Sequence, residues 1–223
     1  MLIHEPVNNM HNLSAHTDPL ATSKASSLPV MEHFYTLQGE GAYQGKAAYF
    51  IRLGGCDVGC TWCDVKDSWE TGRHPLIPIT DLVRFVKATP AEIVVITGGE
   101  PLMHDLTVLT RQLHAAGLRN HIETSGSSPL SGELDWITLS PKKFKEPLPD
   151  VVPFAHELKI VVFNKSDFRW AETWAARVAP GCRLYLQPEW SKSQVMMPLI
   201  IDYIKAHPQW QLSLQIHKFI NVP

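Results

Sequence analysis

Three of the chain's four cysteines lie close together, at Cys56, Cys60 and Cys63, directly after an apolar, β-branched run at residues 48–53. The C-x3-C-x2-C spacing puts three thiolates on one short loop that contains glycine. Such a loop can hold three corners of an iron–sulfur cubane, because each cysteine binds a different iron and the loop need only turn back on itself. The fourth iron then stays open to a small molecule.

Two other interpretations of this cysteine loop remain open. A structural zinc site normally closes with four ligands, so its fourth ligand would have to be the distant Cys182 or one of the eleven histidines. A set of buried cysteines that bind no metal is the second alternative. Cys182 follows Pro180-Gly181 between a predicted helix and a predicted strand, and we expect it to be a partly buried free thiol that the site does not need.

Composition excludes several classes of protein. The chain has 223 residues and a formal net charge of −2, so it has no broad basic field for nucleic acid or an anionic membrane. Its apolar runs are strand-sized, far short of the ~20 residues that span a bilayer. Glu5 and Pro6 stand where a secretory signal would place basic residues and then an apolar run. We therefore expect a cytoplasmic protein that binds neither nucleic acid nor a membrane.

The chain divides into a polar beginning and a patterned remainder. Residues 1–29 are rich in Ser, Asn, Thr and His without a sustained period, which predicts a flexible N-terminal extension. Residues 30–223 form the predicted catalytic domain. Its expected strands are residues 48–53, 93–97, 121–124, 136–140, 158–163, 184–187 and 212–216. Its expected helices are residues 80–88, capped by Thr80, and residues 106–116, 166–178 and 195–206.

This alternation of strands and helices predicts an α/β fold with a mostly parallel sheet and right-handed crossovers. With this few units, a partial (βα) barrel is the natural closure, and its chemistry would lie at the carboxyl ends of the strands. Polar motifs follow four of the expected strands: Gly98-Gly99-Glu100-Pro101, Glu123-Thr124-Ser125-Gly126, Ser140-Pro141-Lys142 and Gln187-Pro188-Glu189. Each alone could be an ordinary turn or a helix cap. Together they predict one polar rim.

The cysteine loop, with Trp62 just before its last cysteine, resembles that of the radical S-adenosylmethionine enzymes. The resemblance implies a 4Fe–4S cluster on Cys56, Cys60 and Cys63 whose open iron binds the methionine part of S-adenosylmethionine. The reduced cluster would release a 5'-deoxyadenosyl radical that the protein positions and shields. The residues that it implies for binding this cofactor are Trp62, Asp64, Gly98, Gly99, Glu100, Ser125, Ser140, Pro141, Lys142 and Gln187.

Two further segments narrow the resemblance. The segment YTLQGEG at residues 35–41, Arg52 before the cysteine loop, and the HKxxNxP pattern that begins at His217 are similar to the 7-carboxy-7-deazaguanine synthase family, which makes 7-deazapurines such as queuosine. That family converts 6-carboxy-5,6,7,8-tetrahydropterin by ring contraction with loss of ammonia, and it is homodimeric and takes electrons from flavodoxin or ferredoxin. The substrate-binding residues that the resemblance implies are Leu37, Gln38, Gly39, Glu40, Arg52, Thr97, His217 and Pro223.

These residue types suit the implied substrate. Arg52 offers a bidentate fork for its carboxylate, while Gln38 and Glu40 offer acceptors for the N–H donors of the pterin edge. Two other functions remain open. A glycyl-radical-enzyme activating protein has similar cysteine spacing but gives no reason for TLQGEG, Arg52 or the HKxxNxP pattern. A zinc-binding or electron-transfer module would have no catalytic activity. A zinc protein is colourless, whereas an iron–sulfur protein is brown, so colour distinguishes the zinc alternative.

One position departs from the family pattern. Members often have Thr or Ser after the Cys-Asp pair, whose hydroxyl ligates Mg²⁺ at the substrate carboxylate, whereas this chain has Val65 after Asp64. Valine offers no ligating oxygen. Either magnesium binds through other groups, with Asp64 or Asp67 in place of the missing hydroxyl, or this member depends on it less. We therefore expect a magnesium site that is weaker than usual or altered.

Overall fold

The computed structural model describes residues 27–223, and its centre is one mixed sheet. The strand order is β3-β1-β2-β4-β5-β6-β7-β8-β9, so the sheet of this part of the chain has two free edges and does not close into a barrel. From β2 through β9 the paired strands are parallel, whereas β1 runs antiparallel to β2 and β3. The strands are β1 (Ser27–Leu37), β2 (Ala47–Leu53), β3 (Leu76–Pro78), β4 (Ile93–Gly98), β5 (Arg119–Thr124), β6 (Trp136–Leu139), β7 (Glu157–Val162), β8 (Arg183–Pro188) and β9 (Trp210–Leu212).

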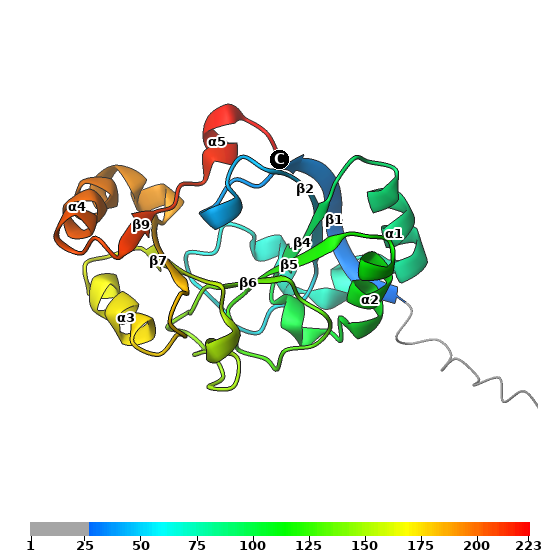
Figure 1. The fold of residues 1–223 in the computed structure, drawn as a ribbon, viewed down its shortest axis with the longest axis horizontal. Helices are drawn as coiled ribbons and strands as arrows, with labels where there is room; N and C mark the ends of the chain where they lie inside the picture. The colour runs from blue at the N-terminus through cyan, green and yellow to red at the C-terminus, as the bar shows by residue number, and fades with distance from the viewer. Residues whose placement is uncertain (1–26) are drawn as a thin grey trace, which may run out of the picture.

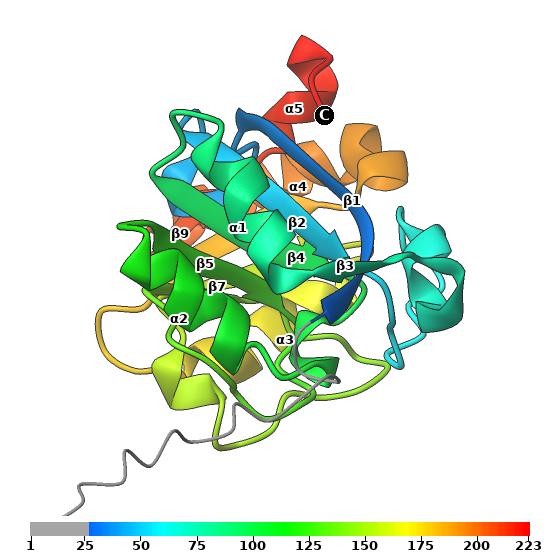
Figure 2. The same ribbon diagram turned by 90° about the vertical axis from the view of Figure 1, so that its right-hand side faces the viewer.

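Four helices cover the outer face of the curved sheet (Figure 1). They are α1 (Ile79–Lys87), α2 (Thr107–Ala115), α3 (Ser166–Ala175) and α4 (Ser193–Ala206). Figure 2 shows α1 and α2 side by side against one half of the sheet. None of the helices in residues 27–223 has the length and hydropathy needed to cross a bilayer.

The helices and the sheet enclose two hydrophobic clusters, one beneath α1 and α2 and the other beneath α3 and α4. Leu109 and Leu113 of α2 are fully buried in the first, and Trp174 of α3 is 2% exposed in the second. Strand β4 is a nearly continuous apolar run because both its faces are covered. Packing therefore fixes the strands, and their carboxyl ends meet at one rim.

The structure confirms most of the predicted elements. The predicted α/β fold of the partial (βα) barrel type, with a mostly parallel sheet, is present as an open sheet, and six of the seven expected strands match within one or two residues. Helix α1 begins one residue before Thr80, and its N-cap is Pro78, so Thr80 is not the cap. Strands β1 and β3 were not predicted from the sequence.

Two expected boundaries do not coincide with the ends of the observed strands. The boundary at residue 29 falls inside β1, where Leu28 and Val30 are buried against α1 and α2; residues 1–26 of the predicted extension lie outside the described residues. The expected strand at residues 212–216 ends at Leu212, because Ile216 begins a further helix, α5 (Ile216–Ile220). The chain leaves the sheet there because Ile216 N–H donates to the carbonyl of Gly39, 3.0 Å away. His217 therefore lies in α5 and not at the end of a strand.

Candidate active site

A cavity of about 250 Å³ lies at the carboxyl ends of β2, β4, β5, β7 and β8. All the residues that the sequence analysis assigned to the site line this cavity, except Glu100 and Pro141. The lining residues from that set are Leu37, Gln38, Gly39, Glu40, Arg52, Cys56, Cys60, Trp62, Cys63, Asp64, Thr97, Gly98, Gly99, Ser125, Ser140, Lys142, Gln187, His217 and Pro223. The fold thus brings the cysteine loop, the polar strand ends, the TLQGEG turn and the C-terminal segment together.

Backbone hydrogen bonds hold the cysteine loop, residues 54–64. Gly55 N–H donates to the carbonyl of Ser68 at 2.6 Å, and Cys56 N–H donates to that of Trp69 at 3.1 Å. The three thiols are free, and that of Cys60 is buried. Burial raises the pKa of Cys60 to about 11, so binding to iron would have to drive loss of its proton.

A zinc site would need four ligands around one ion. Among residues 27–223, no group of three or more His, Cys, Asp or Glu side chains is arranged to hold one metal ion. A cubane does not need such a group, because its thiolates bind separate irons. Cys182, one of the residues that could have been a fourth zinc ligand, packs at the edge of the α3 and α4 core and does not line the cavity, whereas His217, a histidine, does line it.

The GGEP segment lies directly against the cysteine loop. Gly99 N–H donates to the carbonyl of Leu53 at 3.0 Å, and Glu100 N–H donates to that of Gly55 at 2.8 Å. A Cβ atom on Gly99 would lie 2.2 Å from the Gly55 oxygen and 2.8 Å from Cys56 Cβ. This approach of two backbones is possible only without a side chain, and it leaves Gly98 and Gly99 exposed to the cavity.

Glu100 is buried behind this wall, at 1% exposure. Its carboxylate accepts hydrogen bonds from Thr124 Oγ1 (2.5 Å), Ser125 N–H (2.8 Å), Ser125 Oγ (2.5 Å) and Leu102 N–H (3.1 Å). With these bonds it ties the end of β4 to the end of β5 and fixes Ser125 on the cavity wall. Direct contact between Glu100 and a bound cofactor stays a prediction.

Hydrogen bonds also fix the polar side chains at the other strand ends. Lys142 Nζ donates to the carbonyl of Ser140 at 2.8 Å and to its hydroxyl, and its ammonium lies 5.9 Å from the centre of the Trp62 ring. Burial lowers the pKa of Lys142. Gln187 Oε1 accepts from Ser213 Oγ at 2.7 Å. Arg52 donates to Glu32 at 2.6 Å through Nε alone, which leaves the outer edge of its guanidinium for another carboxylate.

The TLQGEG turn, residues 36–41, is locked to the C-terminal segment. Gly41 N–H donates to Ser213 Oγ at 3.0 Å, and Gln215 Nε2 donates to Glu40 Oε1 at 3.0 Å. A Cβ atom on Gly39 would lie 2.1 Å from His217 Nδ1, so any larger residue there would displace the His217 side chain from its present position. Burial lowers the pKa of His217, which favours its neutral form.

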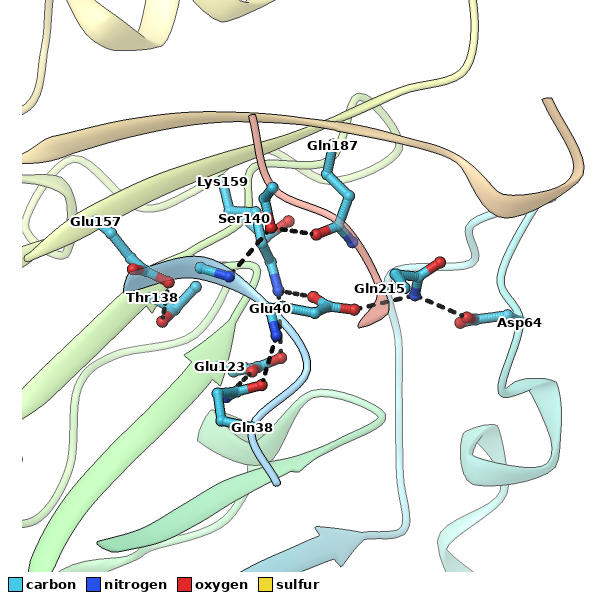
Figure 3. Close-up of polar contacts among 12 residues, drawn as sticks. Gln38, Glu40, Asp64, Glu123, Thr138, Ser140, Glu157, Lys159, Gln187 and Gln215 are labelled. Atoms are coloured by element: carbon cyan, nitrogen blue, oxygen red, sulfur yellow. Dashed lines mark hydrogen bonds and ion pairs between the residues drawn. The ribbon is translucent and has the colours of Figure 1, made fainter. Parts of the chain in front are cut away.

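Sequence reasoning missed a buried lysine and a buried glutamate, both on β7. Lys159 is 4% exposed and lines the cavity, where its ammonium contacts Glu40 and Glu123 (Figure 3). Glu157 accepts from Ala42 N–H at 2.9 Å and so supports the TLQGEG turn. The available signal was two charged residues in the otherwise apolar run ELKIVV, since a charge within a buried strand needs a partner.

Comparison with known proteins gives one consistent result. Residues 50–152 match the Radical SAM superfamily. The 7-carboxy-7-deazaguanine synthase of Flavobacterium psychrophilum is 52% identical over 204 residues, which are 92% of this chain and 97% of the relative, and that of Synechocystis is 50% identical over 92% and 98%. The crystal structure of QueE from Escherichia coli superposes with a TM-score of 0.76 at 33% identity and covers 84% of this chain and 93% of that one.

Proposed function

The chain belongs to the 7-carboxy-7-deazaguanine synthase family of radical S-adenosylmethionine enzymes, and from this premise we propose that it converts 6-carboxy-5,6,7,8-tetrahydropterin to 7-carboxy-7-deazaguanine with loss of ammonia, as a carbon–nitrogen lyase. One observation carries the proposal: the cysteine loop and the predicted substrate residues line the same cavity. A cofactor held by the first would lie within reach of a small molecule held by the second.

The residues present fit the cluster and S-adenosylmethionine. Cys56, Cys60 and Cys63 would hold the 4Fe–4S cluster, and Gly98 and Gly99 leave room for a ligand beside it. The polar groups of Ser125, Ser140, Lys142 and Gln187 would bind the nucleoside and its carboxylate. Bound together, these two cofactors supply one-electron reduction and a radical that abstracts hydrogen.

The protein's own task is to orient the substrate. The free edge of Arg52 would bind the substrate carboxylate through paired N–H groups. Gln38 and Glu40 would accept hydrogen bonds from the pterin edge, and His217, Thr97 and the Pro223 carboxylate would complete its surroundings. A cavity of about 250 Å³, lined in part by His217 and Pro223 of the C-terminal segment, suits a heterocycle and not the protein substrate of a glycyl-radical-enzyme activating protein.

The proposal is tested by an anaerobic reaction. The reconstituted enzyme is given dithionite, S-adenosylmethionine and 6-carboxytetrahydropterin, and mass spectrometry is used to detect 7-carboxy-7-deazaguanine. We expect this product together with brown colour from the cluster, and no product without reductant. Formation of 5'-deoxyadenosine without the product would keep the radical chemistry and contradict the substrate.

We further propose a cytoplasmic homodimer that takes its electron from flavodoxin or ferredoxin. The support for a reducing compartment is the set of four free cysteines. The two 7-carboxy-7-deazaguanine synthases match 92% of this chain and 97% and 98% of their own lengths, which supports the same source of electrons and the same assembly for all three proteins.

Magnesium does not fit the side chains beside the cysteine loop. Val65 supplies no oxygen, and Asp67 is exposed and does not line the cavity. The Asp64 carboxylate accepts from Lys218 Nζ at 2.7 Å. Burial would raise the pKa of Asp64, but the hydrogen bond and the charge of Lys218 outweigh it and lower the pKa. An ammonium group thus already neutralises the carboxylate that a magnesium ion would need, and we propose an enzyme with little dependence on Mg²⁺.

We therefore expect chelation of Mg²⁺ to change the rate of the native enzyme less than about twofold, and Val65→Thr to gain a stimulation by Mg²⁺ of several-fold through a new hydroxyl ligand. The measurement is the initial rate across a magnesium titration after treatment with chelator. Val195→Thr, the same change at an exposed position of α4, is the control and should stay insensitive. Full magnesium dependence of the native enzyme would show that Val65 is no obstacle.

A further inference from the structure

A buried ammonium group stands in the wall of the cavity without a role in the function proposed so far. Lys159 lies in β7 between β6 and β8, at 4% exposure. Removing a charge from water costs several kcal/mol unless nearby groups compensate it. The Lys159 ammonium meets this requirement by contacting Glu40 Oε2 and, at 3.4 Å, Glu123 Oε2.

The three charges come from distant parts of the sequence. Glu40 belongs to the TLQGEG turn, Glu123 to β5 and Lys159 to β7, and all three line the cavity. One ammonium between two carboxylates leaves a net charge of −1 in the wall. Such an arrangement is costly to build, and a role in packing alone would be served as well by apolar side chains of similar volume.

Both carboxylates are also held by amide groups. Glu123 Oε1 accepts from Gln38 Nε2 at 2.9 Å, and Glu40 Oε1 accepts from Gln215 Nε2 at 3.0 Å (Figure 3). Gln38 Oε1 in turn accepts from Glu40 N–H at 3.0 Å. The carboxylates therefore have fixed positions on either side of Lys159, with acceptors presented to the cavity.

We propose that Lys159 is a positioning residue that keeps Glu40 and Glu123 ionised and at a fixed separation, so that they act as paired acceptors for a ligand edge with several N–H donors. This inference rests on the proposed function, in which the amino and ring N–H groups of the pterin are those donors. Without the ammonium, two carboxylates in one wall repel each other, and one of them takes up a proton. A protonated carboxyl group presents a donor where the substrate also presents one.

The electrostatics of the network agree with this role. Burial would lower the pKa of Lys159, but the charges of Glu123 and Glu40 outweigh it and raise the pKa. Burial would raise the pKa of Glu40, but Lys159 outweighs it and lowers the pKa. The other titratable groups that face this network are Glu157 on β7, Lys142 after β6 and His217 on α5, and His217 is in turn faced by Asp64 and Lys218.

The test compares the native holoenzyme with Lys159→Gln and Lys159→Arg. For Lys159→Gln we expect KM for 6-carboxytetrahydropterin to rise on the order of 100-fold, the effect of removing one partner from a buried charge pair. The acid limb of kcat/KM should move to higher pH, because the unpaired carboxylates lose their charge sooner as the pH falls. Iron content and 5'-deoxyadenosine formation should persist, and Lys159→Arg should recover most of the affinity.

The control is Lys205→Gln, which removes an exposed lysine of a 3.8 Å ion pair on α4 and should change neither KM nor the pH profile. If Lys159→Gln alone does not fold, the same comparison is made in the Glu40→Gln background, where one carboxylate is left unpaired instead of two. We then expect KM to rise about 10-fold from Glu40→Gln to the double variant.

This design distinguishes failure of the proposed function from failure of the positioning role of Lys159. If the native enzyme neither binds nor converts 6-carboxytetrahydropterin, the proposed function fails. If the native enzyme converts it and Lys159→Gln shows the same KM and pH profile, the positioning role of Lys159 is overturned. A loss of thermal stability in Lys159→Gln with unchanged KM would likewise overturn it, since that result assigns the lysine to the fold alone.

Discussion

Replacing Cys60 by alanine is expected to lower product formation by on the order of 1000-fold or more, as removal of an essential group from an enzyme does. Cys60 is the buried member of the three cysteines, at 7% exposure, and its replacement leaves a second iron of the cubane without a protein ligand, beside the iron that is already open. We expect loss of the brown absorption and of bound iron together with the activity. The measurement combines iron analysis, the visible spectrum and the anaerobic assay.

The matched control is Cys182→Ala, the same substitution at the other end of the domain. Cys182 packs against the core beneath α3 and α4, and burial raises the pKa of its thiol to about 11, so it stays a neutral thiol. We expect this variant to keep its iron and its rate. Loss of iron from Cys182→Ala, or retention of a full cluster by Cys60→Ala, would contradict the assignment of the ligands.

The central parallel strands were predicted well from the sequence, because a short run of apolar, β-branched residues is enough to identify a buried strand. Residues 93–97 form an apolar, β-branched run, and they became β4 with every residue buried or nearly so. The same rule locates the motifs, since a polar segment that follows a parallel strand lies at the rim of the sheet. The sequence therefore predicted that the cysteine loop, Gly98-Gly99 and Ser140 lie at the same rim, although it predicted no contact between particular residues.

The elements that the sequence did not predict depend on contacts between distant segments. Strand β1 carries Pro29 and several half-buried polar residues, and its pattern becomes that of a strand only when β2 and β3 pair with its two edges. Three residues separate β9 from α5, and the hydrogen bond from Ile216 N–H to the carbonyl of Gly39 sets the position at which α5 begins. Lys159 shows in the sequence only as a charge within an apolar run, and its partners Glu40 and Glu123 are brought beside it by the fold.

Gly99→Ala is the second substitution from which we expect a large effect. Its Cβ would lie 2.2 Å from the oxygen and 2.7 Å from the carbon of the Gly55 carbonyl group, and these backbone atoms cannot rotate away as a flexible side chain could. The new methyl group must push the GGEP segment and the cysteine loop apart, which breaks the bond from Glu100 N–H to Gly55 and displaces Cys56. We expect S-adenosylmethionine cleavage to fall on the order of 100-fold, as it does when reacting groups are misplaced by about 1 Å.

Gly72→Ala is the control for this substitution, because a Cβ at Gly72 would meet no heavy atom within 4 Å and its backbone is not left-handed. The readouts are iron content and the rate of 5'-deoxyadenosine formation, which do not require the pterin. If Gly99→Ala cleaves S-adenosylmethionine at the native rate, the close contact between the two backbones is not what aligns cluster and cofactor. If it loses cleavage but keeps its iron, the contact serves the cofactor more than the cluster, as expected where Gly98 and Gly99 form the wall beside which S-adenosylmethionine binds.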